Sequence, residues 1–151
     1  MKSDPEIDGS YPHTPRPAVG AVVFKDNAVL LVQRAKAPAQ GMWAIPGGSV
    51  RLGETLQAAA EREVLEETGV VIRAGEPVLV FDTIQQDDRG IVQYHYVIVD
   101  LDADYVSGTP RAADDAADAR WVAQDELPHL NVNPATLLLL RDRFSFGKRE
   151  K

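Results

Sequence analysis

The chain has 151 residues, of which 44% are hydrophobic and 26% charged, a balance typical of one globular domain with a single core. Its net charge of −7 argues against a nucleic-acid polymer as partner, although a bound metal ion would still let an acidic pocket accept a small phosphorylated ligand. The chain has no cysteine, which excludes disulfides and thiol chemistry, and no apolar segment long enough for a signal peptide or membrane span. We therefore expect a cytoplasmic protein without a membrane partner.

The N-terminal residues 1–17 combine prolines with polar residues and predict a flexible leader. We expect a single domain over residues 18–146 and a frayed tail over residues 147–151. Two apolar runs, 18–24 and 28–33, flank a Lys-Asp-Asn turn signal and predict a buried β-hairpin.

Two candidate substrate-binding residues follow this hairpin. Arg34 stands at its end, where a forked guanidinium suits a substrate phosphate, although a basic residue after a strand is also commonly just solvated. Residues 41–46 predict a short strand that contains Trp43. The indole of Trp43 either stacks on a nucleobase or belongs to the core, and both interpretations stay open.

Residues 55–69 predict a helix, because a threonine precedes a run of strong helix formers and a glycine follows it. Glu63, Glu66 and Glu67 stand at i, i+3 and i+4, which places their carboxylates within an arc of about 100°. Like charges at this spacing cost only about a few tenths of a kcal/mol, so a solvated acidic face is one interpretation. The other interpretation is that the carboxylates bind a hard divalent cation such as Mg²⁺, which prefers carboxylate oxygens.

The small and apolar residues of the same helix predict how it packs. Ala59 and Ala60 lie on the acidic arc, so this side is small enough for another backbone to approach closely. Val64 and Leu65 lie off the arc and are expected to face a core.

The second half of the chain predicts further strands and a last helix. Asn133 before a proline is typical of a helix N-cap, although its amide is also a candidate for reading a base. The three histidines have no partner at metal-ligand spacing and are expected to be structural. The strands are expected at 70–72, 76–84, 92–101 and 120–122, with a turn at 87–90, a polar loop at 106–119, a short turn or helix at 125–127, and the last helix from Pro134.

A longer pattern surrounds the acidic helix. Gly48 is followed after five residues by Glu54, and after seven more by the run Arg62 to Val70, REVLEETGV. This pattern resembles the Nudix box. The resemblance implies an α/β fold, the Nudix α/β/α sandwich with a central mixed β-sheet and one domain. It also implies a metal-dependent pyrophosphatase that uses Mg²⁺, or Mn²⁺ in its place.

The resemblance also implies a role for each residue of this chain that stands at a functional position of the Nudix box. The resemblance implies that Glu63, Glu66 and Glu67 are metal ligands together with the backbone carbonyl of Gly47. Arg62 and Glu54 are expected to form an ion pair that orients the ligand carboxylates. The box glycines are expected to let the loop backbone bend back over the helix.

Nudix enzymes often take one more acidic residue from the loop before the last strand. Asp115 is the first candidate here and Asp114 its competitor. Glu66, Glu67 and Asp115 are all candidates for the general base that activates water, and their order stays open.

The expected substrate is a small nucleoside diphosphate linked to another group. The stretches FDTIQQDDRGIVQYHYVIVDL and AADDAADARW resemble the ADP-ribose pyrophosphatase-like group, which implies ADP-ribose or a similar nucleotide sugar and the products AMP and a sugar phosphate. A nucleoside triphosphate pyrophosphatase is the alternative, and a non-catalytic nucleotide sensor is a third. A homodimer is a further expectation from the resemblance.

Overall fold

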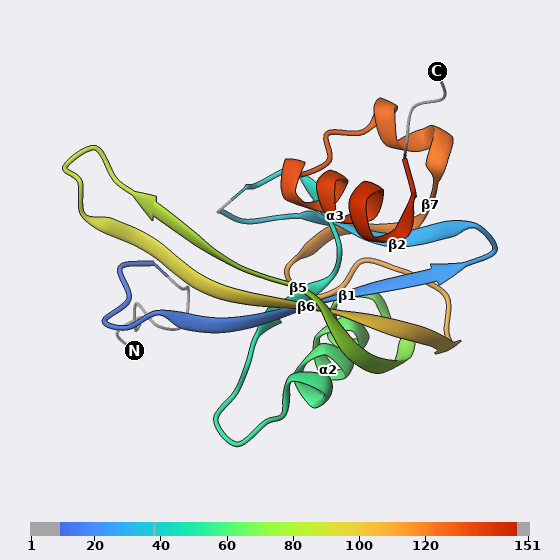
Figure 1. The fold of residues 1–151 in the computed structure, drawn as a ribbon, viewed down its shortest axis with the longest axis horizontal. Helices are drawn as coiled ribbons and strands as arrows, with labels where there is room; N and C mark the ends of the chain where they lie inside the picture. Colours follow the sequence, from blue (N-terminus) through green and yellow to red (C-terminus); the bar gives the residue numbers. More distant parts are fainter. Residues whose placement is uncertain (1–9, 38, 148–151) are drawn as a thin grey trace.

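A mixed β-sheet forms the centre of the protein in the computed structural model, which describes residues 10–37 and 39–147 (Figure 1). The strands of these described residues are β1 (Arg16–Lys25), β2 (Ala28–Arg34), β3 (Trp43–Ala44), β4 (Gly47–Ser49), β5 (Val71–Gln86), β6 (Val92–Ser107) and β7 (Ala116–Ala123). Their main order is β3-β2-β1-β6-β5, with β4 paired to β1 and β7 paired to β2. β1 and β6 are parallel, and the other pairs are antiparallel.

The first hairpin, β1 and β2, is confirmed. Its turn consists of Asp26 and Asn27, whose φ angles of 51° and 63° are the positive values that a tight two-residue turn between twisted strands requires. β1 begins two residues before the expected start of the domain, because Arg16 and Pro17 already pair with β6.

Beyond the turn, β1 and β2 separate, and the segment 43–49 fills the space between them. β1 pairs with β2 at Phe24 and Lys25, whereas its earlier residues 18–20 pair with β4. β3 pairs with the later part of β2. The short strand expected at 41–46 is present as β3, and an additional strand, β4, follows it and places the box glycines directly beside β1.

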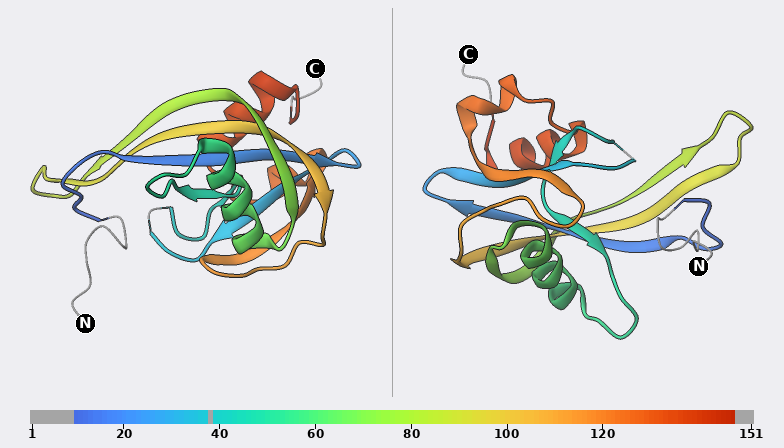
Figure 2. Two further views of the ribbon diagram at one scale, coloured as in Figure 1. Left: turned by 90° about the horizontal axis from the view of Figure 1, so that it is seen from below. Right: turned by 180° about the vertical axis from the view of Figure 1, so that it is seen from behind.

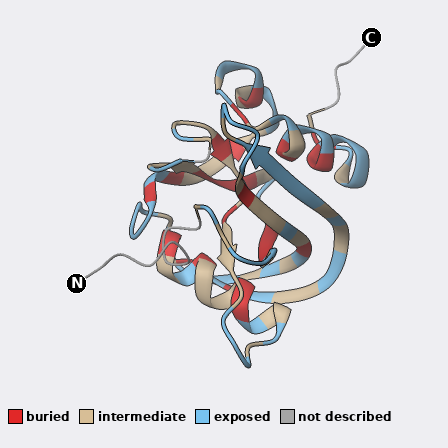
Figure 3. Ribbon diagram, turned by 90° about the vertical axis from the view of Figure 1, so that its left-hand side faces the viewer, coloured by how far each residue is buried: buried red, intermediate tan, exposed pale blue. Residues whose placement is uncertain are grey.

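Helices cover both faces of the sheet (Figures 1 and 2). α2 (Leu56–Thr68) packs on one face and α3 (Pro134–Phe144), with the 3₁₀ helix η1 (Gln124–His129), on the other. Alternation along β1 serves both cores, since Val19, Ala21 and Val23 face α2 while Val22 faces α3. The most deeply buried parts lie between these layers (Figure 3). The expected α/β/α sandwich is confirmed.

Strands β5 and β6 are longer than expected and form a ribbon that extends beyond the helices (Figure 1). The two strands expected at 70–72 and 76–84 are one strand, with register shifts around Pro77 that keep the pairing with β6 intact. β6 continues to Ser107, so the expected loop 106–119 is shorter.

Residues 10–15 run along this ribbon. The Tyr11 hydroxyl donates a hydrogen bond of 2.9 Å to the Asp87 carboxylate, and the Tyr11 N–H donates one of 2.7 Å to the carbonyl of Gln93. This part of the predicted leader is therefore attached to the domain. The predictions for residues 1–9 and 148–151 lie outside the described residues. No helix of the described chain is long and apolar enough to cross a membrane.

Candidate metal and phosphate site

The acidic helix has the bounds that its sequence predicts. Thr55 caps α2 by accepting a hydrogen bond of 3.0 Å from the Ala58 N–H, and Gly69 ends it with a φ of 75°. Ala59 and Ala60 are fully buried against β1, as the small side of the helix requires. Leu65 corrects the prediction, because it lies on the outer side of the helix and is 51% exposed.

Arg62 is the centre of a hydrogen-bonded network beside this helix. Its guanidinium donates to both oxygens of Glu54, at 2.7 and 3.0 Å, and to the backbone carbonyl of Ser49 at 3.0 Å. It also donates to Glu63 at 2.8 Å and to Glu66 at 3.2 Å. The forked pair holds the pKa of Glu54 down at about 2, while its hydrogen bonds raise the pKa of Arg62 above its usual value. The Arg62 and Glu54 pair is thus in the position expected for a support of Glu63 and Glu66.

Glu67 lies deeper, at the junction of α2 and β4. Only 7% of this residue is exposed, and one carboxylate oxygen accepts a hydrogen bond of 2.9 Å from the Gly47 N–H. The pKa of Glu67 is raised to about 8, mainly by burial and also by the charges of Glu63 and Asp114, while the Gly47 hydrogen bond and the charge of Arg34 act in the opposite direction. Burial also raises the pKa of Glu63. The site therefore concentrates acidic groups whose negative charge is only partly compensated.

The glycines Gly47 and Gly48 are required for space. A side-chain carbon on Gly47 would overlap the backbone carbonyl of Val19 in β1, and one on Gly48 would overlap the carboxylate of Glu63. Neither has a positive φ, so these two glycines are needed for the space that they leave and not for a left-handed backbone. Gly53, in the loop before the helix, has the positive φ of 83° that a turn needs.

The loop before β7 brings Asp114, rather than Asp115, towards the cluster. Asp115 forms an exposed ion pair of 3.1 Å with Lys36. Asp114, which has a φ of 55°, is the residue whose charge acts on Glu63 and Glu67. The Ala113 N–H binds the Glu67 carbonyl at 3.0 Å and fixes the loop there. The sequence alone could not decide between two adjacent aspartates, because their directions depend on this tertiary hydrogen bond.

The three candidate substrate-binding residues lie in different surroundings. Arg34 is close enough to Glu67 to influence its pKa, so it belongs to the acidic site. Trp43 is buried among the core residues beneath α3, with the Arg120 guanidinium 5.0 Å from its ring, so its predicted core role fits and base stacking has no free face. Asn133 caps α3 by accepting a hydrogen bond of 2.9 Å from the Ala135 N–H.

The structure also adds two groups that the sequence did not indicate. The carbonyl of Ser49 acts through its backbone, which leaves no side-chain signal. The Arg51 guanidinium lies 3.7 Å from the Glu66 carboxylate, and the Arg51 backbone N–H donates to the Glu54 carboxylate.

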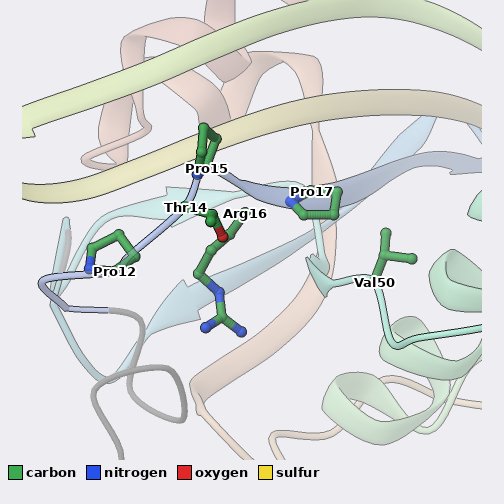
Figure 4. A pocket seen from close by; sticks show the side chains of 6 residues that line it. All are labelled: Pro12, Thr14, Pro15, Arg16, Pro17 and Val50. Carbon is green, nitrogen blue, oxygen red and sulfur yellow. The ribbon is translucent and has the colours of Figure 1, made fainter.

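A pocket of about 180 Å³ lies elsewhere on the protein and is lined by residues of the N-terminal segment and by Val50 (Figure 4). None of the acidic residues lines it, so this pocket is separate from the acidic site.

The acidic residues fit a divalent cation by their chemistry. Glu67 is buried and Glu63 is partly buried, and both carboxyl groups have raised pKa values near the charge of Asp114 and, for Glu63, that of Glu66. A cation would relieve this repulsion and favour the ionised forms. Across the described chain, however, no three acidic or histidine side chains are arranged to hold an ion together. The expected convergence is incomplete because Arg62 holds one oxygen of Glu63 and one of Glu66.

Comparison with known proteins defines the class. A model of the NUDIX domain matches residues 14–142. A MutT Nudix hydrolase of Burkholderia pseudomallei superimposes with a TM-score of 0.68 and 31% identity over 87% of this chain and 99% of that one. The sheet with a helical layer on each face is thus a Nudix fold. The chain belongs to the NUDIX domain family.

Two relatives differ in what their names say they hydrolyse. An ADP-ribose pyrophosphatase of Methanocaldococcus jannaschii is 35% identical over 116 residues. These residues are 77% of this chain and 66% of that protein, so the chain covers just under two thirds of its length. An oxidized purine nucleoside triphosphate hydrolase of Mus musculus is 28% identical over 120 residues, 75% of this chain and 69% of that protein.

Proposed function

We propose that the protein is a Mg²⁺-dependent pyrophosphatase that cleaves the diphosphate bond of ADP-ribose or a similar nucleotide sugar, giving AMP and a sugar phosphate. The observation that carries the proposal is the pair of the partly buried Glu63 and the buried Glu67, whose carboxyl groups have raised pKa values and lie near further acidic groups. Such a cluster is unfavourable unless a cation shares it. The match to an ADP-ribose pyrophosphatase supports the substrate class.

Glu63, Glu66 and Glu67, with the carbonyl of Gly47, are the groups that would hold Mg²⁺, and Mn²⁺ is a possible substitute. The ion would supply charge stabilisation at the phosphate oxygens and would make a water molecule more acidic. Arg62 keeps Glu63 and Glu66 oriented through hydrogen bonds of 2.8 and 3.2 Å. Arg34, whose charge acts on Glu67, would contact a phosphate of the substrate.

In the proposed reaction, water adds to one phosphorus atom and the bond from that phosphorus to the bridging oxygen breaks. The proton of the water passes to a carboxylate, and the bridging oxygen leaves on the second phosphate. Glu66, Glu67 and Asp114 are candidates for the proton acceptor; Asp115 is less suited because its carboxylate forms an exposed ion pair with Lys36 and does not act on the charges of Glu63 and Glu67. Only a group that is ionised in the complex with substrate can take this role.

Turnover of a substrate panel tests the proposal. ADP-ribose, nucleotide sugars and nucleoside triphosphates are incubated with the protein and Mg²⁺ or Mn²⁺, and AMP, sugar phosphate and pyrophosphate are measured. Glu66→Gln is expected to lower turnover about 100-fold or more, because it removes a metal ligand. Glu61→Gln is the matched control, since Glu61 lies on the same helix but accepts a hydrogen bond from the Ala74 N–H. Equal rates for both variants would refute the site.

The alternative is a nucleoside triphosphate pyrophosphatase, which the similarity to the mouse triphosphate hydrolase supports. Release of pyrophosphate from triphosphates, without cleavage of ADP-ribose, would establish it. Nucleotide binding without turnover under either metal would instead support a sensor. A homodimer remains a proposal, and light scattering at several protein concentrations tests it.

A further inference from the structure

The loop between β4 and α2 carries an arginine, Arg51, to which the proposed reaction assigns no role. This loop projects from the body of the protein before the chain enters α2 (Figures 1 and 2). The Arg51 backbone N–H donates a hydrogen bond of 2.9 Å to the Glu54 carboxylate, and the Glu54 N–H donates one of 3.0 Å to the Arg51 carbonyl. The backbone of Arg51 is therefore fixed beside the acidic site, although its side chain is 65% exposed.

The guanidinium of Arg51 stands at one oxygen of Glu66 without binding it tightly. Arg62 donates a hydrogen bond of 3.2 Å to Oε2 of Glu66, whereas the Arg51 guanidinium lies 3.7 Å from Oε1. A distance of 3.7 Å is too long for a hydrogen bond, and an ion pair that is so exposed contributes little to stability. Arg51 thus neutralises part of the charge of Glu66 and can leave it at little cost.

The two arginines at Glu66 differ in how firmly they are held. The Arg62 side chain is only 17% exposed, and its hydrogen bonds extend to two further carboxylates and a backbone carbonyl. Within residues 10–37 and 39–147, the Arg51 guanidinium forms one ion pair, that with Glu66, and its charge also acts on Glu54. A cation that binds Oε1 of Glu66 would therefore displace Arg51 and leave Arg62 in place.

A displaced guanidinium needs another anion, and the proposed substrate supplies one. The oxygens of a diphosphate match the planar fork of an arginine side chain. The two other arginines of the site are engaged elsewhere, since Arg62 is bound to carboxylates and the charge of Arg34 acts on Glu67. Arg51 is thus the exposed cation beside Glu66 that is available to a substrate phosphate.

We propose that Arg51 is a movable substrate-binding residue, which pairs with Glu66 in the empty site and turns to a substrate phosphate once Mg²⁺ holds Glu66. This inference rests on the proposed function, because it takes Glu66 to be a metal ligand and the substrate to be a diphosphate. Removal of Arg51 then has two effects of opposite sign. Mg²⁺ binds more tightly, because a nearby positive charge is gone, and the diphosphate binds more weakly, because it loses a partner.

Calorimetry of the full chain measures both effects. In a titration with Mg²⁺ alone, Arg51→Gln is expected to bind the ion about twofold to fivefold more tightly than the wild type, the range that an exposed charge supports. The second titration, at saturating Mg²⁺, uses adenosine 5′-(α,β-methylene)diphosphate, which resists cleavage because carbon replaces its bridging oxygen. Arg51→Gln is expected to bind this probe about tenfold more weakly, because a charged hydrogen bond is lost.

Two further variants separate this role from net charge and from folding. Arg141→Gln is the matched control, because Arg141 is also an exposed arginine, paired with Asp142 on α3, and its loss should change neither affinity. Arg51→Lys keeps the positive charge without the fork, so it is expected to restore the wild-type affinity for Mg²⁺ and only part of the probe binding. All variants should keep the Tm of the wild type, since both side chains are exposed.

The opposite signs make the outcome decisive. The proposal is overturned if Arg51→Gln leaves both affinities unchanged or shifts them in the same direction, or if Arg141→Gln gives the same two shifts. A wild type that binds neither Mg²⁺ nor the probe would contradict the proposed function, and this inference with it. A wild type that binds both, while Arg51→Gln binds them equally well, would contradict the role of Arg51 alone.

Discussion

Individual carboxylates of this protein differ in charge state because their surroundings differ. Glu54 accepts the forked hydrogen bonds of Arg62, and its pKa falls to about 2, so it stays ionised at every physiological pH. Glu67 lies one turn further along the helix from Glu63, but burial raises its pKa to about 8. Glu54 is therefore a fixed anion that anchors Arg62, whereas Glu67 is mostly protonated at pH 7 until a cation binds.

Binding of Mg²⁺ is expected to release a proton from Glu67. Because the pKa of Glu67 is about 8 without metal, close to one proton per bound ion is released at pH 7, and release decreases as the pH rises through 8. Calorimetric titrations in two buffers with different ionisation enthalpies measure the number of protons. Glu67→Gln should remove this dependence on the buffer and Glu61→Gln should keep it. Proton release that does not change between pH 7 and pH 9 would contradict the assignment.

Asp100, a buried residue of β6, is expected to make the fold less stable as the pH rises. Burial raises its pKa to about 6, above the value of about 4 in unfolded chains, so the folded state holds the proton more tightly and stability falls between these two values. The loss at pH 7 and above is about 3 kcal/mol. Urea unfolding at pH 4 and pH 8 should show that Asp100→Asn gains this amount over the wild type at pH 8 and little at pH 4. An equal difference at both pH values would contradict the prediction.

At the level of elements, the short strand β4 links the sheet to the acidic helix. Its first two residues are glycines because β1 and Glu63 occupy the space of their side chains. Gly47→Ala is expected to cost about 1–3 kcal/mol of stability, because its neighbour is backbone that cannot move aside. Gly48→Ala should leave stability nearly unchanged and reduce metal affinity, because the Glu63 side chain can move away. Unfolding curves and metal titrations of both variants measure this contrast.

The sequence predicts those elements whose signals are local. The helix α2 has its cap at Thr55 and its end at Gly69, and the turn at Asp26 and Asn27 requires only neighbouring residues. Contacts between distant segments were not predictable. β4 becomes a strand only because β1 lies beside it, and β6 extends to Ser107 because β5 continues opposite.

In the candidate site, too, the residues with a local sequence signal were predictable and those that depend on contacts between distant segments were not. The spacing along one helix identified Glu63, Glu66 and Glu67. The preference for Asp114 over Asp115 depends on a loop that is fixed by a hydrogen bond to Glu67, and Arg51 is recognisable only when the folded loop brings its guanidinium beside Glu66. These long-range relations have no periodic signal in the sequence.

At the level of the whole molecule, a net charge of −7 and a concentrated acidic site oppose folding in the absence of cations. Any ion that binds the native state and not the unfolded chain stabilises the protein by mass action. Non-specific screening of the surface charge also stabilises the protein, and it acts with every salt. The two effects are separable because only the first depends on the arrangement of Glu63, Glu66 and Glu67.

Mg²⁺ is therefore expected to raise the Tm beyond the effect of sodium chloride at the same ionic strength. At a concentration 100 times the Kd, the gain is about 2.7 kcal/mol, and EDTA should reverse it. Glu63→Gln should remove the specific part of the shift, because it deletes a proposed ligand, and leave the response to sodium chloride unchanged. Glu61→Gln changes the net charge by the same amount on the same helix and should keep both responses. Equal shifts with magnesium and sodium salts in the wild type would show that the acidic helix is a solvated surface and not a metal site.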